Sequence, residues 1–555
     1  MSVVQSLTRP IAGGLSWLGA GLLQGWLGVD RVLELELGAE SQEPLLLLST
    51  VEAACRLPEI RGLLIHLGGL GWGWASLKEW RDGLERVRAS GVQVVVLAEG
   101  LSNGSLYLAS VADRVLVPPM GEVSLTGVGG SLRFFGPALE SLGLRFDVVS
   151  AGAYKSMGEA FTRRVASPEN REATQALVDG LNEELLACIG ESRKLSREDL
   201  DAVMVKGPMS PQEATDLGLI DGLAYDGELD GHLAGLLGIQ EGDVERVKLG
   251  QISRALGWVR RLSRYSQRLP SVAVLHLAGN ITMGHEPQGR QRIAPGEVIP
   301  VLRELKEDEE VRSVVLAVNS PGGSVLASDL IWKEVAELNE VKPVVACFGD
   351  VSASGGYYIS APARKIYASP GTVTGSIGVV GGKLVTGEAA SRLGVFSEAV
   401  GGGPHLGMYR PDEPFTPEQR QRFKERLAHA YKGFLERVSQ GRGRPVEEIE
   451  PVAQGRVWAG RDALERGLVD GLGGLTQAVN MARELAQMAG PYKRVDLAVR
   501  PPANLLRRLL PAGLVQMLGP VGRLAPMLRL PPAAELLLEA PGQALAVMPV
   551  EVELS

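Results

Sequence analysis

Residues 313–324, SVVLAVNSPGGS, and residues 343–358, PVVACFGDVSASGGYY, decide the fold of this 555-residue chain. Each stretch begins with a run of apolar and β-branched residues, which predicts a buried strand, and each run leads into a glycine-containing turn. Between them, apolar residues recur at helical spacing through Leu330, Val335 and Leu338. Strand, helix and strand in this order predict an α/β domain with a largely parallel sheet.

Ser354 follows the second strand and precedes the pair Gly355-Gly356. A serine at a strand-to-helix turn can present its oxygen to a ligand, as in serine hydrolases. Glycines at such a turn let another backbone come close. Taken alone, a motif this short is more typical of packing between a helix and a sheet than of catalysis. Its meaning therefore depends on the rest of the chain.

The chain contains an internal repeat: the same order of strands, turns and helices occurs a second time about 250 residues later. The first copy has an apolar strand at 62–67, a glycine-rich turn, a helical pattern and a strand at 92–97. Farther on, residues 214–222 (ATDLGLIDG) correspond to residues 463–471 (ALERGLVDG). An offset that persists over the whole unit indicates two α/β domains that arose from an internal repeat.

We expect five segments from this organisation. The first repeat spans residues 45–245 and the second spans 271–490, with an arginine-rich linker at 246–270 between them. Residues 1–44 form an apolar, membrane-associated N-terminal segment, and residues 491–555 form an apolar amphipathic extension. We interpret the linker as solvated rather than as a binding patch.

Composition argues against several classes of function. The net charge of −8 and the pI of about 5.6 give no general attraction to nucleic acid, and 5% aromatic residues is too few for a base-stacking surface. The three cysteines lie far apart and the six histidines show no paired spacing. Neither a disulfide framework nor a metal site follows, and we expect no cofactor.

Two segments have the composition of membrane-associated sequence. Residues from Ile11 to Gly28 carry no charge, but they are rich in glycine and short for a membrane span. A transmembrane helix and an interfacial helix are both consistent with them. Residues 505–530 alternate leucine clusters with arginines and prolines. This pattern predicts short amphipathic helices that lie on a membrane or on a partner subunit.

The two repeats differ at the residues that could carry out chemistry. At an offset of about 250 residues, Ser354 corresponds to Gly104, so the first repeat lacks the hydroxyl. Lys155 corresponds to His405 or Leu406, depending on a one-residue shift in register, so the second repeat lacks the amine. The pattern indicates that one repeat kept a nucleophile and the other kept a base.

These features together resemble the S49 peptidases, in the long two-repeat form of the signal peptide peptidase A type. The resemblance covers about residues 45–490 and rests on the joint occurrence of several motifs. These are NSPGGS at 319–324, ASGGY at 353–357, TGSIG at 374–378 and YKS at 154–156. It implies two tandem domains of the Clp protease/crotonase-like fold.

The resemblance also implies the roles of individual residues. Ser354 would be the nucleophile, Lys155 the general base, and Ser376 the hydroxyl that orients the lysine. The Pro-Gly-Gly turn, through Gly322 and chiefly Gly323, would supply backbone N–H groups to an oxyanion. Without such a constellation, Lys155 would be read as an ordinary solvated lysine.

Elementary chemistry is consistent with these roles. A serine hydroxyl is a poor nucleophile until a neighbouring group takes its proton. A lysine can take that proton only when neutral, so its pKa must fall well below the ~10.4 of a free lysine, and burial lowers it. His405 has no carboxylate partner nearby in the sequence, and we interpret Asp350 as a residue that caps a loop rather than as a triad acid.

We therefore expect a serine endopeptidase that degrades remnant signal peptides or other short hydrophobic peptides through an acyl-enzyme. The resemblance further implies a homotetramer at a bacterial inner membrane, with the catalytic domains outside the cytoplasm. It leaves open whether serine and lysine meet within one subunit or between two. Two alternatives remain: a crotonase-type acyl-CoA enzyme, and a non-catalytic scaffold that binds membrane peptides.

Overall fold

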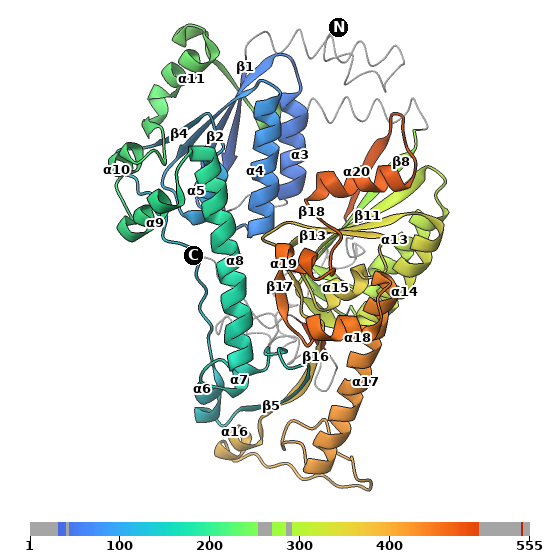
Figure 1. Cartoon of the computed structure of the whole chain (residues 1–555). Coiled ribbons are helices and arrows are strands. Elements are labelled where there is room, and N and C mark those ends of the chain that lie inside the picture. The colour runs from blue at the N-terminus through green and yellow to red at the C-terminus, as the bar shows by residue number, and fades with distance from the viewer. Residues whose placement is uncertain (1–30, 40–43, 253–268, 285–290, 499–544, 548–555) are drawn as a thin grey trace, which may run out of the picture.

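The structure, a computed structural model, describes residues 31–39, 44–252, 269–284, 291–498 and 545–547. It is a mixed α/β protein with three sheets, and two of these form the centres of separate domains (Figure 1). The candidate anchor from Ile11 to Gly28 and the segment 505–530 lie outside the described residues. Of the helices that are described, none is long and apolar enough to cross a membrane.

The first sheet is entirely parallel. Its strands, in spatial order, are β6 (Gly222–Leu223), β4 (Arg114–Val117), β3 (Gln93–Ala98), β2 (Ile60–Leu67), β1 (Arg31–Leu37) and β7 (Glu245–Lys248). The helices of this domain are α3 (Pro44–Cys55), α4 (Trp74–Ala89), α5 (Asn103–Ala109), α6 (Gly136–Ser141), α7 (Glu159–Thr162), α8 (Pro168–Arg193), α9 (Arg197–Lys206), α10 (Pro211–Asp216) and α11 (Leu229–Leu237).

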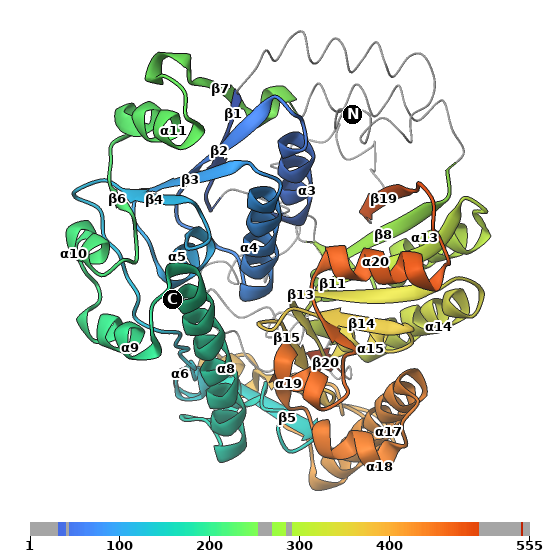
Figure 2. The same cartoon turned by 45° about the horizontal axis from the view of Figure 1, so that its top comes forward.

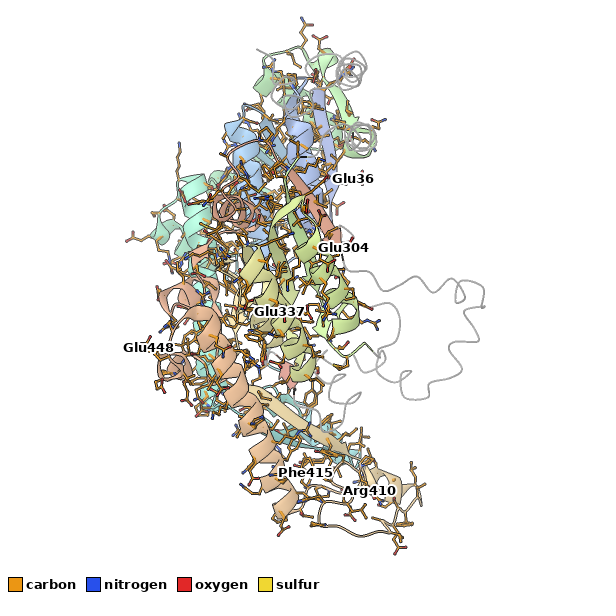
Figure 3. The ribbon with its side chains drawn as sticks, turned by 90° about the vertical axis from the view of Figure 1, so that its right-hand side faces the viewer. Glu36, Glu304, Glu337, Arg410, Phe415 and Glu448 are labelled. Carbon is orange, nitrogen blue, oxygen red and sulfur yellow. The ribbon has the colours of Figure 1, made fainter. Side chains whose placement is uncertain are left out.

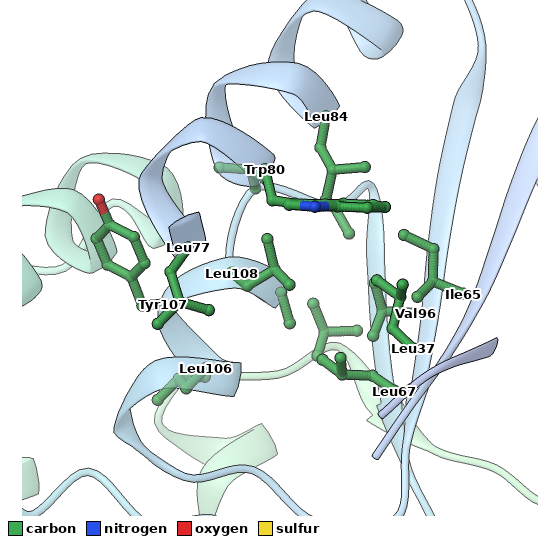
Figure 4. Close-up of a cluster of buried hydrophobic side chains, with 14 of the residues drawn as sticks. Leu37, Ile65, Leu67, Leu77, Trp80, Leu84, Val96, Leu106, Tyr107 and Leu108 are labelled. Atoms are coloured by element: carbon green, nitrogen blue, oxygen red, sulfur yellow. The ribbon is translucent and has the colours of Figure 1, made fainter. Parts of the chain in front are cut away.

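Alternate residues of the central strands face two different layers. Ile65 of β2 belongs to the large core beneath α3, α4, α5 and α8, whereas Leu64 belongs to a smaller core beneath α11. Trp80 and Leu84 of α4 lie over Ile65 and Val96 in the large core (Figure 4). Because helices cover both faces, the strands are almost continuous apolar runs, as is typical of parallel sheets.

The second sheet repeats this order. Its strands are β18 (Gly471–Leu472), β14 (Lys365–Ala368), β13 (Val344–Ala353), β11 (Val311–Ser320), β8 (Ser271–Ala278) and β19 (Lys493–Ala498), all parallel. The far end of β13 also pairs with β15 (Val373–Gly375), which pairs antiparallel with β17 (Val457–Ala459). The helices are α13 (Pro295–Glu307), α14 (Val325–Val341), α15 (Gly355–Ser360), α16 (Gly387–Arg392), α17 (Pro417–Arg442), α18 (Val446–Ile449), α19 (Gly460–Glu465) and α20 (Leu475–Leu485).

The long helices α8 and α17 show why repeated sequence gives repeated elements. Each begins with proline, which suits the first turn, and is capped by a hydroxyl residue, Ser167 or Thr416, whose oxygen accepts a backbone N–H. Each is followed by a residue in the left-handed conformation, Lys194 or Gly443. The same local start and stop signals therefore place a 26-residue helix at the same point of both domains.

Both domains extend beyond the boundaries expected from the sequence. β1 adds to the first sheet although it precedes residue 45, and β19 adds to the second sheet although it follows residue 490. Each lies next to the strand that starts or ends a repeat and carries charged residues among its apolar ones. A short amphipathic segment of this kind is stabilised as a strand by its neighbour in the sheet, which is not visible in its own sequence.

The third sheet joins the two repeats. Its spatial order is β10 (Arg292–Ile293), β9 (Asn280–Ile281), β12 (Gly322–Ser324), β20 (Leu545–Val547), β16 (Val379–Val385) and β5 (Arg145–Ala151). β5 belongs to the first repeat, and it pairs antiparallel with β16 of the second along its whole length. This pairing carries the chain that follows β5 into the second domain.

A polar cluster at one end of the molecule fixes the β5–β16 pair. Buried Asp147 of β5 accepts the backbone N–H of Phe415 at 2.8 Å and forms an ion pair with Arg420. Buried Lys383 of β16 donates to the backbone oxygens of Met408 and Arg410, each at 2.9 Å. Figure 3 shows Arg410 and Phe415 at the end of the molecule opposite Glu36. The cluster thus anchors the strand that leads to Lys155.

Candidate active site

Ser354 occupies a sharp turn between β13 and α15. Its φ of 54° and ψ of −111° are unusual for a residue other than glycine. Its N–H donates to the Gly375 oxygen at 2.8 Å, and its own carbonyl accepts the N–H of Tyr358 at 2.8 Å. The side chain is fully buried. The backbone therefore holds the hydroxyl in one place rather than leaving it on a free loop.

The two glycines after Ser354 allow the neighbouring backbone to approach. A Cβ on Gly355 would lie 2.8 Å from Ser328 Oγ and 3.1 Å from Gly322 Cα. A Cβ on Gly356 would lie 2.7 Å from the Ser320 oxygen. This close approach is what the sequence motif predicted, and it brings the Pro-Gly-Gly turn against the start of α15.

Lys155 reaches Ser354 from the other repeat. Its Nζ lies 2.8 Å from Ser354 Oγ, 3.0 Å from Ser376 Oγ and 2.9 Å from the Ser376 backbone oxygen. All three side chains are buried. The structure thus brings together the three side chains that the sequence singled out, although Lys155 and Ser354 are 199 residues apart in the sequence.

Burial lowers the pKa of Lys155 well below its usual value. Its three contacts suit a neutral amine, which has two N–H groups and one lone pair. The amine can donate to the two oxygens of Ser376 and accept the hydroxyl proton of Ser354. An ammonium in the same place would be desolvated with no carboxylate among these partners.

A loop of the second repeat that the sequence analysis did not single out holds Lys155 in place. The Gln454 oxygen accepts the N–H of Tyr154 at 2.8 Å, and the Arg456 oxygen accepts the N–H of Ser376 at 2.7 Å. Gly455 lies between them with a φ of 78°. One short loop therefore binds the backbone of the residue before Lys155 and the backbone of Ser376. The Gln-Gly pair indicates a turn, but nothing local shows what the turn contacts.

A charged cluster supports this loop from outside. Arg456 Nη1 donates to Glu172 Oε1 at 2.6 Å, and the Tyr154 hydroxyl donates to Glu172 Oε2 at 3.0 Å. The Arg456 guanidinium lies 4.9 Å from the Tyr154 ring and 4.3 Å from the Trp458 ring. These contacts fix the residue immediately before Lys155 against the second repeat.

Asp350 binds a helix of the first repeat. Its Oδ1 accepts the Ser76 N–H and its Oδ2 accepts the Ser76 hydroxyl, both at 2.8 Å, in the first turn of α4. Burial raises the pKa of Asp350, and these hydrogen bonds oppose the rise. Glu79 of α4 in turn accepts the Leu475 N–H at 3.2 Å in the first turn of α20. Asp350 therefore joins the two domains as a helix cap, and both of its carboxylate oxygens accept hydrogen bonds from Ser76.

Replacing Asp350 with alanine is expected to lower the free energy of unfolding by about 1–2 kcal/mol, because α4 loses its cap. Asp350→Asn is the matched control, since its amide oxygen can still accept the Ser76 N–H. Its free energy of unfolding should fall less than that of Asp350→Ala. Urea unfolding of the three proteins at pH 7 measures the differences. Equal stability of Asp350→Ala and the wild type would contradict the role of this cap.

The two glycines predicted to serve an oxyanion lie on β12, beside α15. Gly322 has a φ of 105°, and its N–H donates to Ser320 Oγ at 3.2 Å. A Cβ on Gly323 would lie 1.9 Å from the Ile281 oxygen. Both positions therefore require glycine, and the amide of Gly322 already has a partner within the turn.

His405 takes no part in the hydrogen bonds of this cluster. His405 is exposed, and its ring is not among the hydrogen-bond partners of Lys155 or Ser354. Among the described residues, no group of three or more histidine, cysteine or acidic side chains comes together as a metal site would require.

Known proteins resemble this chain over most of its length. The sequence profile of "Peptidase family S49" matches residues 86–236 and 336–489. The chain is 31% identical over 435 residues to "Serine protease SPPA, chloroplastic" of Arabidopsis thaliana, an alignment that covers 78% of this chain and 64% of the relative.

Two bacterial relatives are both named "Protease 4". The relative from Salmonella typhi is 33% identical over 435 residues, which cover 74% of this chain and 66% of the relative. The relative from Haemophilus influenzae is 30% identical over 457 residues, which cover 80% and 72%. The chain thus spans just under two thirds of the length of the Arabidopsis and Salmonella relatives.

Proposed function

Because this chain belongs to peptidase family S49, we propose that it is a serine endopeptidase with Ser354 as nucleophile and Lys155 as general base. The observation that carries the proposal is the 2.8 Å contact between Lys155 Nζ and Ser354 Oγ in a buried site. The two residues meet within one chain, which supports a dyad formed inside each subunit.

The proposed reaction proceeds through an acyl-enzyme. Ser354 Oγ attacks the carbonyl carbon of the scissile peptide bond while its proton passes to Lys155 Nζ. The resulting ammonium then gives this proton to the departing amine as the C–N bond breaks. A water molecule then attacks the acyl carbon while Lys155 Nζ takes one of its protons. The bond from this carbon to Ser354 Oγ breaks, the acid is released, and the lysine returns the proton to Ser354 Oγ. Ser376 keeps the amine directed at Ser354 throughout.

Backbone N–H groups at the start of α15 and on β12 are proposed to stabilise the oxyanion. Gly355 is the first residue of α15, where N–H groups have no acceptor within the helix. Gly323 lies beside it, because the Cβ position of Gly355 is only 3.1 Å from the Gly323 nitrogen. Removing one such donor typically lowers the rate about 10²- to 10³-fold.

The parallel sheets with helices on both faces support, for each repeat, the Clp protease/crotonase-like fold that we propose. The two alternatives to a peptidase, a crotonase-type acyl-CoA enzyme and a non-catalytic scaffold, find no support in the relatives. The substrates that we propose are remnant signal peptides or other short hydrophobic peptides. A membrane-associated homotetramer with extracytoplasmic catalytic domains remains a proposal that rests on the resemblance alone.

A fluorophosphonate probe with mass mapping tests the proposed dyad. The wild type should be labelled on Ser354, and Lys155→Met should not, because methionine fills the space of lysine but takes no proton. Ser352→Ala is the matched control: this serine is also buried in β13, and its hydroxyl has no partner among the described residues. The control should be labelled like the wild type.

Label on another residue, or undiminished label on Ser354 in Lys155→Met, would contradict the dyad.

A further inference from the structure

Residues Leu545–Val547 form β20, a strand between β12 and β16. Val547 pairs with Gly322, Ala546 with Gly323 and Leu545 with Ser324, all in antiparallel register. Leu545 also pairs antiparallel with Val380 of β16. A segment from far along the chain therefore lies directly against the two glycines proposed to serve the oxyanion. Figure 2 shows β20 beside α15.

β12 and β16 do not pair with each other, and β20 separates them in the sheet. β12 pairs on its other side with β9, at Gly323 and Ile281, and β16 pairs on its other side with β5. Each strand therefore offers one edge of backbone N–H and C=O groups to whatever lies between them. Such edges bind an extended peptide, which gains main-chain hydrogen bonds on both of its sides.

This position is next to the proposed nucleophile. β20 contacts α15, the helix that begins directly after Ser354. Gly355, the first residue of that helix, approaches Gly322 so closely that a Cβ would lie 3.1 Å from its Cα. A peptide that follows the path of β20 therefore passes beside Ser354, as the backbone of a cleaved substrate must.

We propose that the space between β12 and β16 binds peptide substrates as extended strands antiparallel to both, and that Leu545–Val547 is an internal peptide that competes for it. The proposal rests on the peptidase function proposed above. It adds the orientation in which the substrate peptide binds, and it makes β20 a regulator of substrate binding. An internal competitor is present at a high effective concentration, so it lowers the apparent affinity for an external peptide without altering the chemistry.

Ala546→Pro tests this competition in the full chain. Proline has no N–H and does not fit in the middle of a strand that is paired on both sides, so β20 should leave the groove. KM for a short fluorogenic peptide should then fall on the order of tenfold, as it would if β20 occupied the groove nine-tenths of the time, with kcat unchanged. Ala546→Ser keeps the N–H and is the matched control, so its KM should equal that of the wild type.

A second measurement does not depend on activity. In the Ser354→Ala background, amide hydrogen exchange of the peptide that covers Gly322–Ser324 should be faster with Ala546→Pro than without it, because β12 loses a paired edge. Faster exchange supports the competition. Exchange and KM that are both unchanged in Ala546→Pro would overturn it.

The experiments distinguish failure of the peptidase proposal from failure of the proposal that β20 competes with substrate. If the fluorophosphonate probe labels Ser354 but Ala546→Pro leaves KM and exchange unchanged, the peptidase proposal stands and the internal competitor is wrong. If the probe labels no variant on Ser354 while exchange at β12 still increases in Ala546→Pro, β20 does occupy this groove but the groove does not serve the proposed dyad.

Discussion

A Lys155→Met variant is expected to lose about 10⁴- to 10⁶-fold in kcat, the range seen when a member of a catalytic triad is removed from a serine protease. KM should stay within about threefold, because Lys155 is proposed to act on the proton of Ser354 rather than on the bound peptide. Steady-state hydrolysis of a fluorogenic peptide, with active sites counted by the probe, measures both constants.

Lys383→Met is the control that shows whether removing any buried lysine lowers kcat as much as Lys155→Met does. Lys383 is also buried, but it donates to the backbone oxygens of Met408 and Arg410 and not to Ser354. Its loss should reduce stability while the folded protein keeps a kcat within about tenfold of the wild type, since no reacting atom is touched. A kcat for Lys155→Met within tenfold of the wild type would rule out a base at this position.

The pH dependence of the reaction should report the same amine. Since burial lowers the pKa of Lys155, kcat/KM should rise with pH as the folded enzyme loses this proton, and it should level off well below the ~10.4 of a free lysine. A rate that continues to rise to pH 10 would contradict a base of lowered pKa.

The lowered pKa of Lys155 should also make the free energy of unfolding depend on pH. Between the lowered pKa and about 10.4, the unfolded chain holds a proton on this lysine that the folded chain lacks, so the wild type gains stability as pH rises through that window. At pH 7 the free energy needed to bury this amine lowers the stability of the wild type, whereas Lys155→Met has no amine to bury. The variant should therefore be the more stable protein in urea at pH 7, by a margin that narrows toward pH 10.

A Gly455→Ala variant is expected to lose about 100-fold or more in kcat, since a displacement of about 1 Å at a catalytic group has that effect. A Cβ at this position would lie 2.7 Å from the N, Cα and Cβ atoms of Lys155. The first two belong to the backbone and Cβ is bonded directly to it, so no side-chain rotation relieves the contact. The φ of 78° at Gly455 is also unfavourable for alanine, which adds about 1–2 kcal/mol of strain. Kinetics and urea unfolding of the purified variant measure the two effects.

Gly433→Ala is the matched control for this substitution. Gly433 lies inside α17, and a Cβ there would meet nothing within 4 Å. Alanine in a helix interior should raise the free energy of unfolding by about 0.5–1 kcal/mol and leave kcat unchanged. Wild-type kcat in Gly455→Ala would show that the loop from Gln454 to Arg456 does not position the lysine.

Much of the fold could be predicted because its signals are local and occur twice. The apolar runs that became β2, β3, β11 and β13 are buried on both faces, so their sequences alone identify them. The family inferred from the four motifs is confirmed by the profile match. The domain boundaries were less predictable, because β1 and β19 carry charged residues among their apolar ones and become strands by pairing with β2 and β7 and with β8.

The third sheet could not be predicted from local sequence. β12 and β20 are three residues long, and β5 pairs with a strand of the other repeat. Nothing in such short segments selects a partner more than 200 residues away, because register and pairing are set by the packed domains. The same holds for Asp350, whose sequence indicates a cap but not that the capped helix belongs to the other domain.

The family could be inferred from the linear sequence, and Ser354, Lys155 and Ser376 could be proposed as its site residues, since motif and spacing are local properties. Only the tertiary structure decided that β5 crosses to the second domain and that the Gln454–Arg456 loop binds the backbone of Tyr154 and lies against Lys155 there. It also decided that the Lys155 amine is buried among hydroxyl and carbonyl oxygens. The physical reason is desolvation: burial lowers the pKa of the Lys155 amine, and the groups that bury it come together only when the two repeats pack.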